Sequence, residues 1–255
     1  MSKILDVKNI EKYYGRGGNV FKAIDDISLE VLEGEFVGVM GPSGSGKTTL
    51  LNLISTIDAV SAGNIIISNE DITDISKKKL AKFRRENLGF IFQEFNLLDT
   101  LTLHENIALA LTINKTPKFD IDARVLSVAK ELGISEFLDK YPYEVSGGQK
   151  QRCACARALV TKPKLILADE PTGSLDSRSA QLFIEMISDL NKKNTSTILM
   201  VTHDSFTASY CDRILFIKDG KIFTELVKGD NTRKRFFNQI LDVVALLGGD
   251  VRDVR

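Results

Sequence analysis

The residues with the clearest chemical potential form the run GPSGSGKT at 41–48 of this 255-residue chain. The run fits the pattern GxxxxGK[ST] and lies between an apolar strand-like stretch, EFVGVM, and a helical one, TTLLNLISTI. Glycines let successive backbone N–H groups point at phosphate oxygens, and a helix that starts near Gly46 presents its positive end to the same anion. Lys47 would reach the β- and γ-phosphates of ATP, and the Thr48 hydroxyl would ligate Mg²⁺. We therefore predict a phosphate-binding loop (P-loop) whose nucleotide-binding residues are Gly41, Ser43, Gly44, Ser45, Gly46, Lys47, Thr48 and Thr49.

Two adjacent acids end a second apolar run, KLILADE at 164–170. In a chain that has a P-loop, an apolar strand that ends in acids is typical of the Walker B motif. Asp169 would hold Mg²⁺ through water, and Glu170 would polarise the attacking water as general base. Neighbouring carboxylates at a buried strand end repel each other unless a cation or a reacting water uses them. This pair predicts hydrolysis of the bound ATP.

Three further polar side chains follow or precede apolar runs. His203 ends the run TILMVTH, and ligands of a parallel sheet bind at the carboxyl ends of its strands. We therefore expect His203 on the same edge as Asp169, in contact with the γ-phosphate. Taken alone, Gln93, after GFIF, is best interpreted as a surface glutamine, and Tyr14, in KYYG, as a core or surface tyrosine.

The elements that must position these residues are readable from hydrophobic spacing. Short all-apolar runs separated by helical ones predict an α/β fold with a parallel sheet covered on both faces. A middle region, about 94–150, reads as mainly helical, with LHENIALALTI and DARVLSVAKELGI as its clearest pieces. QKQRCACARALV reads as another helix. The run RKRFFNQILDVVALL has apolar residues at 236, 240, 243, 244 and 247, which is helical spacing. The stretch 231–247 could bind a partner, but we expect it to pack on its own domain.

The overall composition excludes some classes of protein. Lys+Arg and Asp+Glu balance at 34 each, which argues against a nucleic-acid binder and against an acidic-lipid binder. No stretch approaches the ~20 apolar residues that span a bilayer, and we predict no signal peptide. The three cysteines contain no CxxC pair, so we interpret them as small apolar core residues of a reducing compartment.

The run VSGGQ at 145–149, before KQR and the helix CACARAL, is not explained by folding needs. Two glycines at a helix entrance destabilise the helix, but they supply bare N–H groups for an anion. A second phosphate-binding helix terminus would be redundant within one monomer. It makes sense if it serves a nucleotide that another subunit holds.

With these motifs in this order, the sequence resembles the ABC transporter ATPase family over at least residues 4–225. SGGQ at 146–149 is similar to the family's signature motif, with Val145 where leucine is usual. The resemblance implies that Tyr14, rather than Tyr13, stacks on adenine. It also implies that Gln93 is the Q-loop glutamine, with a catalytic and a metal-binding role, and that His203 is the switch histidine. The remaining nucleotide contacts that it implies are Ser146, Gly147, Gly148, Gln149 and, in the D-loop, Asp176.

The resemblance also implies the architecture and the partners. The fold would be a P-loop NTPase (RecA-like) core with an antiparallel β subdomain and an inserted helical subdomain at about 94–150. The ATPase domain would span 1–225, followed by a C-terminal helical extension over 226–255. Two copies would form a head-to-tail homodimer with two ATP molecules between them. The pair would drive an integral membrane permease at the cytoplasmic face of the membrane, through a groove at Phe95, Leu97 and Leu98.

A narrower resemblance rests on GFIFQEFNLLDTLTLHENI, DKYPYEVSGGQKQR and MVTHDSFTASYCDRILFIKDGKI. These stretches are similar to exporter ATPases that protect Gram-positive bacteria from peptide antibiotics such as bacitracin and lantibiotics. In that branch the permease is often linked to a sensor histidine kinase. The alternatives are the ATPase of a lipoprotein-release, macrolide-export or cell-division complex.

Three rival classes fit less well. A DNA-repair ATPase would carry a long coiled coil, but residues 49–144 show no sustained heptads. A two-cassette translation factor would have a second P-loop. A scaffold that binds ATP without turnover would not need Glu170 and His203.

Overall fold

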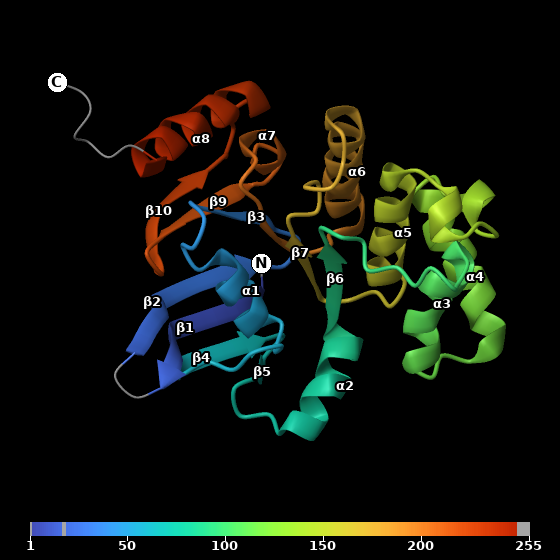
Figure 1. Cartoon of the computed structure of the whole chain (residues 1–255), viewed down its shortest axis with the longest axis horizontal. Helices are drawn as coiled ribbons and strands as arrows, with labels where there is room; N and C mark the ends of the chain where they lie inside the picture. The colour runs from blue at the N-terminus through green and yellow to red at the C-terminus, as the bar shows by residue number, and fades with distance from the viewer. Residues whose placement is uncertain (1, 17–18, 249–255) are drawn as a thin grey trace. The chain divides into compact units, whose positions relative to one another are not determined.

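The computed structural model describes residues 2–16 and 19–248. The chain forms two compact units, one made of Met1–Ile75 with Leu199–Arg255 and the other of Ser76–Ile198 (Figure 1). Residues 249–255 of the predicted C-terminal extension lie outside the described residues. The predicted division at residue 225 stays a prediction.

The first unit contains an antiparallel sheet near the N-terminus, drawn in blue to cyan in Figure 1. Its strands are β1 (Lys3–Arg16), β2 (Asn19–Leu32), β4 (Ala62–Ile67) and β5 (Glu70–Asp71), in the order β2-β1-β4-β5. Ile27, Leu29 and Val31 alternate with exposed neighbours and are buried, the period of a half-buried strand. The predicted antiparallel β subdomain is thereby confirmed.

The first unit also holds four strands in the order β10-β9-β3-β8. They are β3 (Phe36–Met40), β8 (Ile198–Val201), β9 (Arg213–Lys218) and β10 (Lys221–Val227). β3 and β9 run parallel, and every residue of β3 and β8 is buried, as expected for central strands. β3 leads through the P-loop into α1 (Lys47–Ile54).

The C-terminal helix α8 (Arg233–Gly248) contacts the short helix α7 (Ser205–Ala208) within this unit (Figure 1). Phe236 and Ile240 are fully buried, and Arg233 lies over the ring of Tyr210, 4.4 Å from its centroid. The predicted helix and its packing on its own unit are confirmed. The packed face is narrower than predicted, because Val244 is exposed.

The second unit pairs two parallel strands, β6 (Leu88–Phe92) and β7 (Leu165–Asp169), with helices. The helices are α2 (Lys77–Asn87), α3 (Leu103–Ile113), α4 (Lys118–Glu131), α5 (Gly147–Leu159) and α6 (Ser177–Asn194), with 3-10 turns at Ser135–Phe137 and Pro142–Glu144. α3 and α5 contact each other, and α4 contacts both. The predicted helical region is confirmed, whereas α2 and α6 were not predicted. None of the helices within 2–16 and 19–248 is long and apolar enough to cross a membrane.

Candidate nucleotide site

The P-loop curls immediately after β3 because its glycines adopt backbone conformations and positions that other residues do not tolerate. Gly41 has φ 158° and Gly46 has φ 104°. A Cβ at Gly41 would lie 2.1 Å from the carbonyl oxygen of Ile217, and one at Gly46 would lie 2.7 Å from that of Ala23. The loop therefore depends on glycine for its shape, as the motif predicts.

Lys47 and Ser45 supply hydrogen-bond donors of the kind that a bound phosphate requires. The Lys47 side chain is buried, and its Nζ donates to the carbonyl oxygens of Gly41 and Pro42, at 2.9 Å each. The hydroxyl of Ser45 is buried and has no hydrogen-bond partner among the residues that the structure describes. A buried polar atom without a partner is unfavourable unless a ligand supplies one. With the start of α1 at Lys47, these groups fit a phosphate chain.

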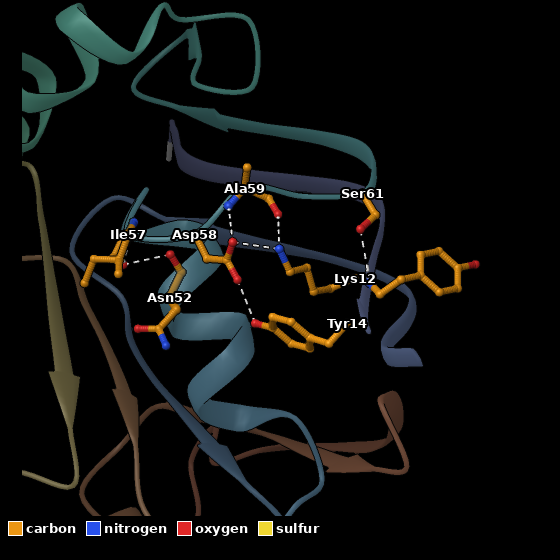
Figure 2. A network of polar contacts seen from close by, with 9 residues as sticks. Lys12, Tyr14, Asn52, Ile57, Asp58, Ala59 and Ser61 are labelled. Atoms are coloured by element: carbon orange, nitrogen blue, oxygen red, sulfur yellow. Dashed lines mark hydrogen bonds and ion pairs between the residues drawn. The ribbon is translucent and has the colours of Figure 1, made fainter. Parts of the chain in front are cut away.

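Two other predicted residues, His203 and Tyr14, belong to the same unit as the P-loop. The amide of Thr202 donates to the carbonyl oxygen of Val39 at 3.1 Å, so the end of β8 lies beside the end of β3. His203 follows directly and is exposed. Tyr14, on β1, has an exposed ring, and its hydroxyl donates to Asp58 Oδ2 at 2.7 Å (Figure 2).

In the second unit the two acids stand at the end of β7. The strand ends at Asp169, and Glu170 has φ 48°, in the left-handed region. The amide of Gly173 donates to the Glu170 carbonyl oxygen at 2.9 Å, which closes a turn. A left-handed conformation at a residue other than glycine is unfavourable, and such residues cluster at active sites.

Gln93 lies directly against this turn. A Cβ added at Gly173 would lie 2.9 Å from the Gln93 Nε2 atom, so glycine is what lets the two approach. The structure therefore brings together the segment after β6 and the segment after β7, both within the second unit.

The predicted signature residues form the entrance of α5. Ser146 is the N-cap, and its hydroxyl accepts from the amide of Gln149 at 3.3 Å, while the Gln149 side chain accepts from the amide of Ser146 at 2.8 Å. Hydrogen bonds from Ser179 and its neighbours hold the pKa of Asp176 below its ordinary value, and Asp176 caps α6. A Cβ at Gly148 would lie 3.5 Å from the side chain of Ser179, whose hydroxyl donates to Asp176, so the signature lies beside the start of α6.

These features match a known protein family. The profile of the ABC transporter family matches residues 24–173, which include the P-loop, Gln93, the signature and Asp169. The chain belongs to the ABC transporter family. It is an ATP-binding protein of that family, and an ATPase.

The relatives of this ABC ATPase match along nearly the whole chain. It is 52% identical to the "Bacitracin export ATP-binding protein BceA" of Halalkalibacterium halodurans, over 98% of this chain and 99% of that one. It is also 52% identical to the "ABC transporter ATP-binding protein YxdL" of Bacillus subtilis, over 100% of this chain and 98% of that one. A solved structure, the dimeric post-hydrolysis state of "the ATP-binding cassette MJ0796 bound to ADP and Pi", matches with TM-score 0.79 and 38% identity, over 88% of this chain and 98% of that one.

One buried residue of this ABC ATPase was not predicted. Gln151, on α5, is fully buried, and its Nε2 donates to the carbonyl oxygens of Phe92, at 3.1 Å, and Pro171, at 2.5 Å. It thereby joins the residue before Gln93 to the residue after Glu170. The signal was available, because Gln151 lies three and four residues before the apolar Ala154 and Cys155, on the face that α5 buries.

The predicted magnesium ion stays a prediction, and of its predicted ligands Asp169 ends β7 and Thr48 lies in the first turn of α1. Within the described ranges, no group of three or more His, Cys, Asp or Glu residues could hold a metal ion. Mg²⁺ keeps several waters and binds through one or two protein groups plus substrate phosphates, so it needs no such cluster.

Proposed function

We propose that this ABC ATPase binds ATP on the P-loop at 41–48 and hydrolyses it with Glu170 as general base. The support is the buried Lys47 ammonium and the Ser45 hydroxyl at the start of α1. The second support is the left-handed backbone of Glu170, φ 48°, which turns the chain directly after β7.

In the proposed reaction, Glu170 accepts a proton from the water whose oxygen attacks the γ-phosphorus. The bond from that phosphorus to the β–γ bridging oxygen breaks, and ADP leaves with the electron pair. His203 contacts the γ-phosphate, and Gln93 orients the water. Thr48, Asp169 and Gln93 would hold Mg²⁺, which supplies positive charge to the β- and γ-phosphate oxygens.

We further propose that a second copy of the chain completes each site. The supporting observation is the open entrance of α5, where Gly147 and Gly148 offer bare backbone N–H groups. In the proposed dimer, Ser146, the two glycines, Gln149 and Asp176 of one copy face the ATP on the P-loop of the other. The relative MJ0796 has been solved as a dimer with ADP and Pi bound.

The proposed permease docks on the second unit. A groove of about 320 Å³ is walled by apolar side chains of β6 and α3, among them Phe90, Phe92 and Ile113. Arg157 lines it too, and its guanidinium donates to the carbonyl oxygens of Phe95 and Asn96, the segment after Gln93.

None of the predicted docking residues, Phe95, Leu97 and Leu98, is fully buried. Their exposure favours a contact surface over ordinary core. Arg84 and Arg85 also line the groove, so the permease segment that fits it carries acidic as well as apolar side chains.

We propose that the transporter protects its host against cell-wall-directed peptide antibiotics. The observation that carries this proposal is the 52% identity to a bacitracin-export ATPase along nearly the full length of both chains. Macrolide export is supported less, because the matching MacB protein of Aggregatibacter actinomycetemcomitans is 39% identical and this chain spans 35% of its length. A link to a sensor histidine kinase through the permease belongs to the same proposal.

The catalytic part is tested by Glu170→Gln, because an amide cannot accept the water's proton. We expect unchanged ATP binding, loss of turnover and an ATP-dependent dimer in size-exclusion chromatography. Glu136→Gln, the same change at an exposed carboxylate, is the control and should behave as wild type. A Glu170→Gln variant that turns over ATP at the wild-type rate would refute the assignment. One that stays monomeric with ATP at high concentration would refute the shared site.

The cellular part compares a wild-type host with one carrying Glu170→Gln. We expect the variant strain to be more sensitive to bacitracin or a lantibiotic and equally sensitive to a ribosome inhibitor. Equal sensitivity of both strains to every peptide would remove the resistance role and leave the ATPase assignment standing.

A further inference from the structure

A polar network in the first unit surrounds the side chain of Asp58 (Figure 2). Lys12 Nζ donates to Asp58 Oδ1 at 2.6 Å and to the Ala59 carbonyl oxygen at 2.7 Å. The amide of Ala59 also donates to Oδ1, at 2.7 Å, while Oδ2 accepts the hydroxyl of Tyr14. One carboxylate therefore holds two side chains of β1 at once.

Asp58 is itself fixed to the C-terminal end of α1, the helix that begins at Lys47. The amides of Ile57 and Asp58 donate to the carbonyl oxygen of Asn52, at 3.0 and 3.1 Å. Thr56 takes a left-handed conformation, φ 60°, which turns the chain back after the helix. The carboxylate is thus anchored to the backbone of the phosphate-binding helix rather than to a loop tip.

The charge states suit this arrangement. Partial burial would raise the pKa of Asp58, but hydrogen bonds from Lys12, Tyr14 and Ala59 outweigh it and lower the pKa. Partial burial and then the Asp58 carboxylate raise the pKa of Tyr14. At neutral pH, Asp58 is therefore an acceptor and the Tyr14 hydroxyl a donor.

The ring of Tyr14 is held although it is exposed. Its exposed fraction is 41%, its hydroxyl end is bonded to Asp58, and the Lys12 ammonium lies 4.8 Å from its centroid. An exposed aromatic side chain normally loses rotamer freedom when a ligand stacks on it. Here the network removes that freedom before binding.

We propose that Lys12 and Asp58 are positioning residues that hold the Tyr14 ring ready to stack on the adenine of ATP. They tie the base-binding ring to the helix that binds the phosphates, so that base and phosphate contacts move as one body. The inference rests on the proposed nucleotide site and adds to it two residues that touch neither base nor phosphate.

The neighbouring Tyr13 is a matched control within the same strand. Its exposed fraction is 40%, its hydroxyl donates to Glu11 Oε2 at 2.7 Å, and the Lys22 ammonium lies 5.3 Å from its ring centroid. Those partners belong to β1 and β2, whereas the partner of Tyr14 follows α1. Removing the hydroxyl of Tyr13 thus makes the same chemical change without touching the link to the helix.

The experiment measures binding of ATP and of inorganic tripolyphosphate, which has no base, to the full chain. Tyr14→Phe keeps the ring and removes the bond to Asp58. We expect it to weaken ATP binding about two- to tenfold, the cost of ordering one side chain on binding. Lys12→Met with Asp58→Ala should do the same, and adding Tyr14→Phe to that pair should cause little further loss. Tripolyphosphate affinity and kcat at saturating ATP should stay at wild-type values, while KM for ATP rises.

Tyr14→Ala and Tyr13→Phe complete the set. Tyr14→Ala should weaken ATP binding about 5- to 100-fold, as expected for a lost base–aromatic stack, and Tyr13→Phe should change nothing. Wild-type ATP affinity in Tyr14→Phe, with a loss in Tyr14→Ala, would overturn the positioning role and keep the stacking role. An equal loss for ATP and tripolyphosphate would make the network a mere support of α1. Wild-type affinity in Tyr14→Ala would overturn the stacking assignment itself.

Discussion

Gln151→Leu tests whether one buried amide holds the segments that carry Gln93 and Glu170. The Gln151 side chain is fully buried and donates two hydrogen bonds, to the carbonyl oxygens of Phe92 and Pro171. Its Oε1 atom is buried and has no hydrogen-bond partner among the described residues. The leucine variant therefore loses two bonds and also removes one unsatisfied oxygen.

The expected magnitude follows from these three groups. Two lost hydrogen bonds remove about 2 kcal/mol of net stability, and carbonyl oxygens left without a donor raise the loss by about 1 kcal/mol or more each. Removal of the unsatisfied Oε1 gives back about 1 kcal/mol. We expect Gln151→Leu to lower the free energy of unfolding by about 3 kcal/mol, which corresponds to a melting temperature lower by roughly 6–12 °C.

A second variant, Gln151→Glu, separates hydrogen bonding from shape. It places a carboxyl group of equal size against two carbonyl oxygens, where a charged form would be repelled and desolvated. The pKa of that carboxyl would be raised above its unfolded value of about 4.3. The variant should therefore lose more stability than Gln151→Leu, and the loss should grow as the pH rises above about 4.

Urea unfolding followed by circular dichroism measures both effects, with ATP turnover measured in parallel. Gln181→Leu, at an exposed glutamine of α6, controls for loss of an amide as such and should stay within about 0.5 kcal/mol of wild type. We expect kcat to fall in Gln151→Leu. Wild-type stability in Gln151→Leu, or equal stability of the two Gln151 variants at every pH, would refute the reasoning.

Two further predictions are simpler. Lys47→Ala should weaken ATP binding at least about tenfold with little change in melting temperature, because the phosphates lose a charge-assisted donor; unchanged affinity in a nucleotide titration would contradict the P-loop assignment. The buried cysteines should resist iodoacetamide in the folded chain, because burial raises the pKa of the Cys153 thiol to about 12 and also raises the pKa of the Cys155 and Cys211 thiols; rapid alkylation at pH 8, followed by mass spectrometry, would show that these positions open.

The P-loop and the strand ends were predictable because the same residues determine chemistry and local shape. Gly41 and Gly46 are required by the backbone, and Asp169 ends a strand whose other residues are buried. The helix α8 was predictable from its buried Phe236 and Ile240. In each case the residues that determine the local structure lie close together in the sequence.

The helices α2 and α6 were missed for different reasons. α2 is polar on nearly all sides and buries Phe83, so it offers no apolar stripe to read. α6 buries Phe183, Ile184, Ile187 and Leu190, which have helical spacing and were readable.

The network around Asp58 was not predictable from local pattern. Lys12 and Asp58 are 46 residues apart, and neither belongs to the residues that the motifs mark as functional. The pairing of β1 with β4 and the turn after α1 bring them together. Contacts that depend on two long-range pairings leave no periodic signal in the sequence.

The signature glycines show how the structure separates folding needs from functional needs. At Gly147 and Gly148 the backbone is not left-handed, and an added Cβ would meet its nearest neighbours at 3.7 and 3.5 Å, ordinary contact distances. Alanine would fit there and would favour the helix by about 1 kcal/mol per position. The single chain therefore gives no steric reason for glycine at the entrance of α5, unlike at Gly41 and Gly46. A requirement for bare backbone would then come from something that approaches from outside the chain, which supports the proposal that this entrance faces the ATP of a second copy.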